Sequence, residues 1–122
     1  MKRTALLIDD DADMREVIAA ALESIDLEID VVDDGIAALD PKKDYSVILL
    51  DLNMPIFDGE RLVSYWMLTR PEIVHRVIIL TGYSRTARSL PKTFASLTKP
   101  VDLGELLEVV EKCAGYTPAG KI

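Results

Sequence analysis

Short apolar runs alternate with amphipathic stretches along most of the chain. Five runs are short and mostly rich in β-branched residues, which is typical of strands that are buried on both faces of a sheet. They cover residues 4–8, 28–32, 47–50, 77–80 and, more weakly, 94–98. Because segments with helical spacing separate them, the pattern predicts an α/β fold with a parallel sheet covered on both faces.

The segments between the runs carry helix start and stop signals. Residues 13–16 (DMRE) fit a capping box, and apolar positions then recur from Val17 to Ile25. Helices are also predicted over residues 36–39 and 60–70, each ended by a proline, with Trp66 and Met67 facing the core. A last helix over residues 103–113 ends with Gly115 as its C-cap.

The stretch between residues 82 and 93 departs from this regular pattern. It contains few helix formers, and Pro91 would interrupt a regular helix. We therefore predict a shortened or irregular fourth helix, either a single turn near residues 86–90 or an irregular loop.

Length and composition favour a single globular domain. The chain has 122 residues, of which 49% are hydrophobic, and this is too apolar for a disordered chain. We expect one domain over residues 1–115 and a tail or the start of a linker over residues 116–122. No apolar run approaches the roughly 20 residues of a membrane span, and no signal-peptide core is present. The single Cys113 cannot form an internal disulfide, so a cytoplasmic location is expected.

Charge is distributed unevenly between the two halves of the chain. The net charge is −7, and residues 1–60 contain 16 acidic and 5 basic side chains. The second half is weakly basic but has no run of Lys or Arg. Because nucleic-acid binding depends on clustered basic residues, we expect no direct contact with DNA or RNA.

Three acidic residues follow two of the predicted strands. Asp9 and Asp10 come directly after the first run, and Asp51 comes after the third. In a five-stranded sheet of order 2-1-3-4-5 these strands are neighbours, about 4.8 Å apart, and sites form beyond their carboxyl ends. Three carboxylates in one crevice repel one another, and Mg²⁺ is a suitable counter-ion for such oxygen ligands.

Two further polar residues follow the later strands. Thr81 comes after the fourth run and Lys99 after the fifth. A hydroxyl, an ammonium and a metal ion around one carboxylate suit a phosphoryl group, and a carboxylate can itself be the nucleophile. The strand ends alone therefore predict aspartyl phosphorylation at Asp51.

Four segments together resemble one known family. They are residues 7–11 (LIDDD), 47–59 (VILLDLNMPIFDG), 77–82 (VIILTG) and 97–100 (LTKP). In this order and spacing they are similar to the receiver domains of two-component response regulators, over residues 4–115. The resemblance implies a doubly wound, flavodoxin-like sheet. It also implies a signalling switch whose only chemistry is self-directed, Mg²⁺-dependent phosphotransfer and autodephosphorylation.

The resemblance assigns a role to each matching residue. It implies that Asp51 accepts a phosphoryl group from a sensor histidine kinase or a histidine phosphotransfer protein. It implies Mg²⁺ held by Asp10, Asp51 and the backbone carbonyl of Asn53, with Asp9 acting mainly through water. Thr81 and Lys99 would bind the phosphoryl oxygens, and a cis peptide bond is implied between Lys99 and the proline that follows it.

The sequence departs from the family at the readout position. Receivers commonly place Tyr or Phe three residues before the motif lysine, and here that position is Ser96. The span from Thr81 to Lys99 is also a few residues short. We therefore hypothesise that the segment over residues 82–93, with Tyr83 near its start, changes on phosphorylation in place of the usual aromatic switch.

Other interpretations of the acidic residues are weaker. An EF-hand loop starting at Asp9 would need Gly and Glu where Met14 and Ala20 stand. Asp11 and Asp13 are better explained as helix caps. A phosphatase of the haloacid dehalogenase type would need an acid at Asn53. A receiver-like module that binds partners without phosphorylation stays open, as do the kinase, the stimulus, the output and the oligomeric state.

Overall fold

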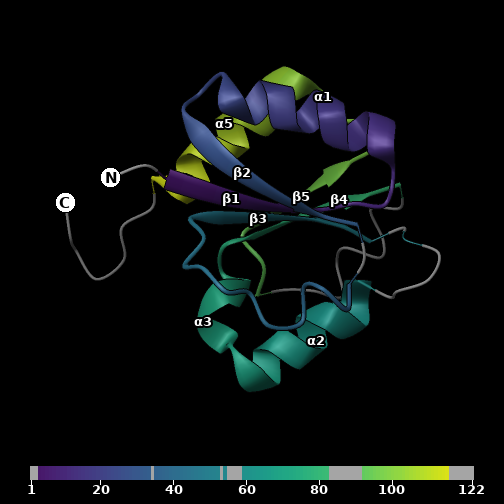
Figure 1. The fold of residues 1–122 in the computed structure, drawn as a ribbon, viewed down its shortest axis with the longest axis vertical. Coiled ribbons are helices and arrows are strands. Elements are labelled where there is room, and N and C mark those ends of the chain that lie inside the picture. Colours follow the sequence, from purple (N-terminus) through teal and green to yellow (C-terminus); the bar gives the residue numbers. More distant parts are fainter. Residues whose placement is uncertain (1–2, 34, 53, 55–58, 83–91, 116–122) are drawn as a thin grey trace.

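A five-stranded parallel sheet forms the centre of the computed structural model, which describes residues 3–33, 35–52, 54, 59–82 and 92–115. The strands are β1 (Arg3–Ile8), β2 (Leu27–Val32), β3 (Val47–Asp51), β4 (Val77–Thr81) and β5 (Ala95–Thr98). Their order in the sheet is β2-β1-β3-β4-β5, and Figure 1 shows the strands between two layers of helices. All five apolar runs form strands, and the doubly wound α/β fold with its 2-1-3-4-5 order is confirmed.

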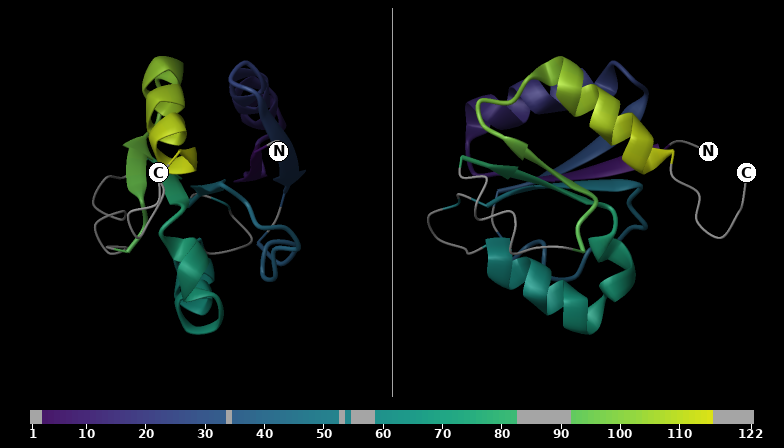
Figure 2. Two further views of the ribbon diagram at one scale, coloured as in Figure 1. Left: turned by 90° about the vertical axis from the view of Figure 1, so that its left-hand side faces the viewer. Right: turned by 180° about the vertical axis from the view of Figure 1, so that it is seen from behind.

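Helices cover both faces of this sheet. Helix α1 (Ala12–Glu23) and helix α5 (Leu103–Ala114) lie on one face. Helix α2 (Gly59–Thr69) and the short α3 (Pro71–Val74) lie on the other, as the two views of Figure 2 also show. This arrangement explains why residues 5–8, 47–50 and 77–80 of the central strands are all apolar, since neither face of the sheet meets water there.

The core is divided into two layers by the sheet. Successive strand residues point to opposite faces, so Val47 and Leu49 pack in the cluster that includes α1 and α5. Ile48 and Leu50 pack in the opposite cluster, which includes the fully buried Trp66 of α2. The prediction that Trp66 belongs to the core is therefore confirmed.

Strand register brings the predicted site residues to one edge. Ile8 pairs with Leu50 across β1 and β3, so the residues that follow them, Asp9 and Asp51, lie side by side. Thr81 pairs with Thr98 across β4 and β5, and Lys99 follows directly. The carboxyl ends of four neighbouring strands thus meet at one place.

The start of α1 differs from the predicted capping box. The N-cap is Asp11, whose Oδ1 accepts hydrogen bonds from the backbone N–H groups of Asp13 (3.0 Å) and Met14 (3.2 Å). Asp13 lies inside the first turn, where its charge still interacts favourably with the helix dipole. The helix ends at Glu23, and Val17 is 48% exposed, so the predicted apolar stripe was one position too wide.

Two further local predictions are corrected. Residues 36–39 form hydrogen-bonded turns, because the Leu39 N–H donates to Ile36 O only three residues back. Met67 of α2 is 37% exposed, whereas the neighbouring Trp66 is fully buried against the sheet. The proline after α2 ends that helix as predicted, and it stands at the first turn of α3, a position that proline tolerates. Residues 83–91, where the shortened fourth helix was predicted, lie outside the described residues.

Candidate functional site

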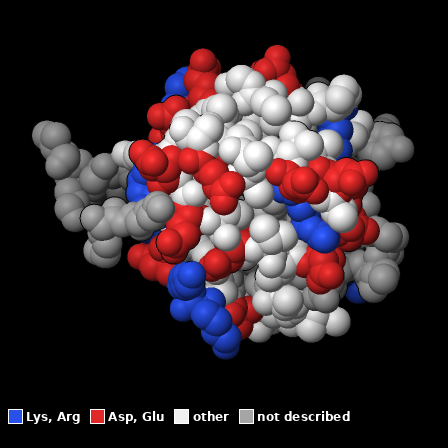
Figure 3. All heavy atoms as spheres, turned by 45° about the horizontal axis from the view of Figure 1, so that its top comes forward, with Lys and Arg blue, Asp and Glu red and all other residues white. Residues whose placement is uncertain are grey.

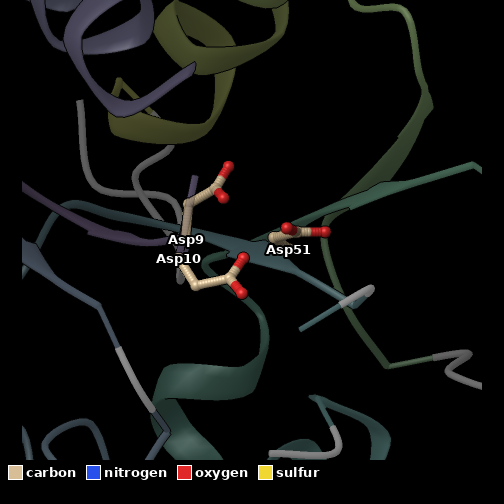
Figure 4. A group of neighbouring side chains, drawn as sticks. All are labelled: Asp9, Asp10 and Asp51. Atoms are coloured by element: carbon tan, nitrogen blue, oxygen red, sulfur yellow. The ribbon is translucent and has the colours of Figure 1, made fainter. Parts of the chain in front are cut away.

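Three carboxylates meet at the carboxyl edge of the sheet. Asp9 and Asp10 lie in the turn between β1 and α1, and Asp51 is the last residue of β3. One oxygen from each lies within 4.8 Å of the others, and Figure 4 shows the three side chains around a common space. Asp9 and Asp51 are buried, whereas Asp10 is exposed. The sequence prediction that these carboxylates converge is confirmed by this geometry.

A lysine ammonium and a threonine complete the edge. The Lys99 Nζ lies 3.0 Å from Asp51 Oδ1, and the lysine side chain is 24% exposed. Thr81 is buried at the end of β4, and its backbone carbonyl accepts a hydrogen bond of 2.8 Å from the Lys99 N–H. The peptide bond between Lys99 and Pro100 is cis, as the resemblance implied.

Asp9 carries the strongest sign of an incompletely balanced site. Its Oδ1 accepts a hydrogen bond of 2.9 Å from the Asp11 N–H. Its Oδ2 is buried and has no hydrogen-bond partner among the described residues. Burial, together with the nearby Asp51 carboxylate, raises the pKa of Asp9 from 3.8 to about 6, although the Asp11 N–H and the Lys99 ammonium oppose this shift.

The donor set fits a hard divalent cation. Three carboxylates contribute oxygen ligands, the type of ligand that Mg²⁺ prefers. Lys99 is the only ammonium that the described residues bring into ionic contact with Asp51, and one positive charge cannot balance three ionised carboxylates. The orphaned Oδ2 of Asp9 is a further oxygen that a hydrated cation would satisfy.

Other predicted site residues are not placed at this edge by the described structure. Asn53 and Tyr83 lie outside the described residues. Ser96 is exposed in the middle of β5. It pairs in register with Ile79, two residues before the end of the strand, where Thr81 pairs with Thr98.

Two residues near the site were missed by sequence reasoning. Arg15 of α1 donates from its Nη1 to the Asp9 carbonyl at 3.0 Å, a contact that no spacing rule indicates. Gly59 begins α2 so close to β3 that a Cβ there would lie 2.7 Å from Leu52 Cδ2 and 3.2 Å from Leu52 Cα. Gly59 is the last residue of the 47–59 segment that resembles the family, but only the packed structure shows why a side chain does not fit there.

The comparisons with known proteins agree with this geometry. Residues 5–111 match the family model of the response regulator receiver domain. The chain is also 30% identical over 118 residues to the response regulator receiver protein CpdR of Brucella abortus, covering 92% of this chain and 96% of CpdR. The chain therefore belongs to the response regulator receiver family, and it is a receiver domain of a two-component system.

Further relatives include larger regulators and solved receiver structures. The chain is 31% identical to PilR of Pseudomonas aeruginosa over 113 residues, which cover 89% of this chain but only 25% of PilR. The magnesium-bound receiver domain of the sensor histidine kinase PA1611 from Pseudomonas aeruginosa has a TM-score of 0.83 at 25% identity, covering 95% of this chain and all of that one. The response regulator TrrA of Thermotoga maritima, in complex with Mg²⁺ and BeF, has a TM-score of 0.80 at 27% identity, covering 91% and 98% of the two chains.

The surface of the described residues is rich in acidic groups on the side of α1 and α5. Figure 3 turns this side forward and shows Asp and Glu side chains in several groups, with fewer Lys and Arg between them. Such a surface is a poor match for a phosphate backbone. No helix in the described part of the chain is long and apolar enough to cross a membrane.

Proposed function

We propose that this receiver is operated by phosphorylation of Asp51, with the phosphoryl group supplied by the phosphohistidine of a sensor histidine kinase or a histidine phosphotransfer protein. The observation that carries the proposal is the position of Asp51, which lies between the carboxylates of Asp9 and Asp10 and the ammonium of Lys99. A buried carboxylate flanked by a fixed cation and oxygen ligands for a metal is suited to phosphoryl transfer.

The transfer itself needs one bond to form and one to break. A carboxylate oxygen of Asp51 attacks the phosphorus, and the phosphorus–nitrogen bond to the partner's imidazole breaks, leaving its electron pair on the imidazole. Lys99 and Thr81 contribute an ammonium and a hydroxyl to the phosphoryl oxygens. Asp10, Asp51 and the Asn53 backbone carbonyl would hold Mg²⁺, with Asp9 acting mainly through water. When bound, Mg²⁺ neutralises charge on the transferred group.

The proposal includes a domain boundary and a readout. Residues 1–115 act as the receiver domain and residues 116–122 as a tail or the start of a linker. The readout does not pass through an aromatic side chain on β5, since the exposed Ser96 occupies that position. Instead, Tyr83 and its neighbours over residues 82–93 respond to phosphorylation. Hydrogen exchange with and without beryllofluoride tests this, and changes confined to residues 94–113 would contradict it.

Labelling with acetyl phosphate tests the nucleophile. In the presence of Mg²⁺, intact-mass spectrometry should show one added phosphoryl group that hydroxylamine removes. Asp51→Asn should lose the label, because the carboxamide that replaces the carboxylate is not a nucleophile at neutral pH. Asp44→Asn is the matched control, since Asp44 has an 86% exposed side chain paired with Arg76 and lies before β3, at the opposite edge. It should label normally.

Two outcomes would contradict the proposal in different ways. Full labelling of Asp51→Asn would place the acceptor elsewhere. Wild-type protein that binds Mg²⁺ but takes no label, from acetyl phosphate or from a phosphorylated histidine phosphotransfer protein, would favour a receiver that binds partners without phosphorylation.

A further inference from the structure

The exposed carboxylate of the acidic cluster is held only through its backbone. Among the described residues the Asp10 side chain has no hydrogen-bond or ion-pair partner, whereas the neighbouring Asp9 is anchored by its Oδ1. The direction in which the Asp10 side chain leaves the backbone therefore depends on the peptide planes on either side of it. Whatever fixes those planes also sets the region that one of the three oxygen donors can reach.

Among the described residues, three hydrogen bonds hold Asp9 in the turn that carries Asp10. The Asp9 N–H donates to Val32 O at 3.2 Å, and the Asp11 N–H donates to Asp9 Oδ1 at 2.9 Å. The third is the bond from Arg15 Nη1 to the Asp9 carbonyl, at 3.0 Å. This carbonyl belongs to the peptide plane that joins Asp9 to Asp10, so the Arg15 bond sets the direction in which Asp10 leaves the strand.

We propose that Arg15 is a positioning residue for the cation site, and this inference rests on the proposed function. Its guanidinium reaches back from the first turns of α1 to the end of β1, a sequence separation of six residues. The contact is partly buried, which reduces competition from water. A charged donor also forms a stronger bond to a carbonyl than a neutral one. Arg15 acts on the metal through Asp9 and Asp10 and does not touch the ion.

The charge of Arg15 and its hydrogen bond to the Asp9 carbonyl should have opposite effects on Mg²⁺ affinity. A positive charge close to the carboxylates, considered alone, weakens the binding of a cation, so its removal should tighten Mg²⁺ binding. A positioning bond strengthens binding, so its removal should weaken it. The sign of the change in affinity therefore separates a positioning role from a purely electrostatic one.

The experiment measures Mg²⁺ affinity by calorimetry in four proteins. They are the wild type, Arg15→Met, Arg15→Lys and the control Lys112→Met. Lys112 lies near the end of α5, is 71% exposed and pairs only weakly with Glu108 at 3.9 Å, so its loss removes one positive charge away from the site. Methionine keeps most of the aliphatic length of either side chain, and circular dichroism confirms that each variant is folded.

We expect Arg15→Met to bind Mg²⁺ roughly 3- to 10-fold more weakly than the wild type, below the loss typical of a residue bonded directly to a ligand side chain. Arg15→Lys should recover part of the affinity, and Lys112→Met should bind as well as the wild type. In acetyl phosphate labelling, the Mg²⁺ concentration for half-maximal rate should rise in Arg15→Met while the rate at saturating Mg²⁺ is kept.

Each other result has a defined meaning. Equal or tighter binding by Arg15→Met would overturn the positioning role while leaving the phosphorylation proposal intact. A loss in Arg15→Met that Lys112→Met shares would also overturn it, because the effect would then not depend on the bond between Arg15 and the Asp9 carbonyl. Failure of the wild type to bind Mg²⁺ would defeat the cation site itself, and the positioning role with it.

Discussion

The two edges of the sheet treat their charged groups differently. We call the amino edge, before β3 and β4, the balanced edge, because opposite charges are paired there. Arg76 pairs with Asp44 at 2.7 Å and donates to the Tyr45 carbonyl at 2.9 Å. Nearby, Arg70 Nε lies 2.7 Å from Glu72. At the carboxyl edge, three carboxylates share the single ammonium that the described residues supply, and Asp9 Oδ2 is left without a partner among them.

A hollow also lies at the balanced edge. A cavity of about 680 Å³ is bordered there by α3, the residues leading into β5 and the end of α5, including Phe94 and Cys113. Burial raises the pKa of the Cys113 thiol to about 11, so it stays protonated at neutral pH and is a poor nucleophile. The contrast teaches that uncompensated charge, rather than the presence of a hollow, distinguishes the candidate site of this receiver.

Among the substitutions considered, replacing Asp9 should have the largest effect on the excess of negative charge at the carboxyl edge. The folded protein holds the Asp9 proton up to a pKa of about 6, whereas the unfolded chain releases it near 3.8. Without Mg²⁺, the wild type therefore loses stability as the pH rises from about 4 to about 6, and the full penalty applies above this range. Asp9→Asn should be more stable than the wild type at pH 7.5 by roughly 1–3 kcal/mol.

Urea unfolding in the presence of a chelator, at about pH 4.5 and about pH 7.5, measures this difference. Asp44→Asn serves as the control, since it removes an aspartate from the balanced edge and should follow the wild-type pH dependence. If Asp9→Asn and the wild type change in parallel between the two pH values, Asp9 does not carry the excess charge.

Mg²⁺ should raise the stability of the folded protein by binding at the carboxyl edge. A cation that binds only the folded protein stabilises it by about 1.4 kcal/mol when its free concentration is tenfold above Kd. The unfolding midpoint of the wild type should rise accordingly, and Asp10→Ala should lose most of this rise because one oxygen donor is gone. A thermal midpoint unaffected by Mg²⁺ would be evidence against an assembled acidic pocket.

The strand ends explain why much of the site was predictable. Residues 5–8, 47–50 and 77–80 are wholly apolar, so the first polar residue after each of them marks where the strand leaves the core. Asp9, Asp51 and Thr81 are these residues, Lys99 follows the weaker fifth run, and a parallel sheet gathers its carboxyl ends at one edge. For this reason the α/β fold with a parallel sheet followed from the pattern alone, whereas the convergence of the acids also required the strand order 2-1-3-4-5.

Contacts that depend on side-chain packing were not predictable in the same way. Asp11 and Asp13 are both good helix caps, and only the backbone direction at the end of the turn selects Asp11. The apolar pattern of α2 does not show that Trp66 is fully buried against the sheet while the neighbouring Met67 is exposed. The Arg15 bond ends on a carbonyl, and any residue type has one, so no motif indicates it.

The smallest effect is expected from the balanced edge itself. Asp44→Ala removes the partner of Arg76, but the Asp44 side chain is 86% exposed and water solvates both charges. Arg76 also keeps its bond to the Tyr45 carbonyl. The free energy of unfolding should therefore fall by less than about 0.5 kcal/mol, as for most surface ion pairs. Urea unfolding with and without Mg²⁺ checks both parts of this expectation, because the stabilisation by Mg²⁺ should equal that of the wild type. A loss of several kcal/mol, or a changed response to Mg²⁺, would show that the two edges are coupled through β3 and that the contrast between them does not hold.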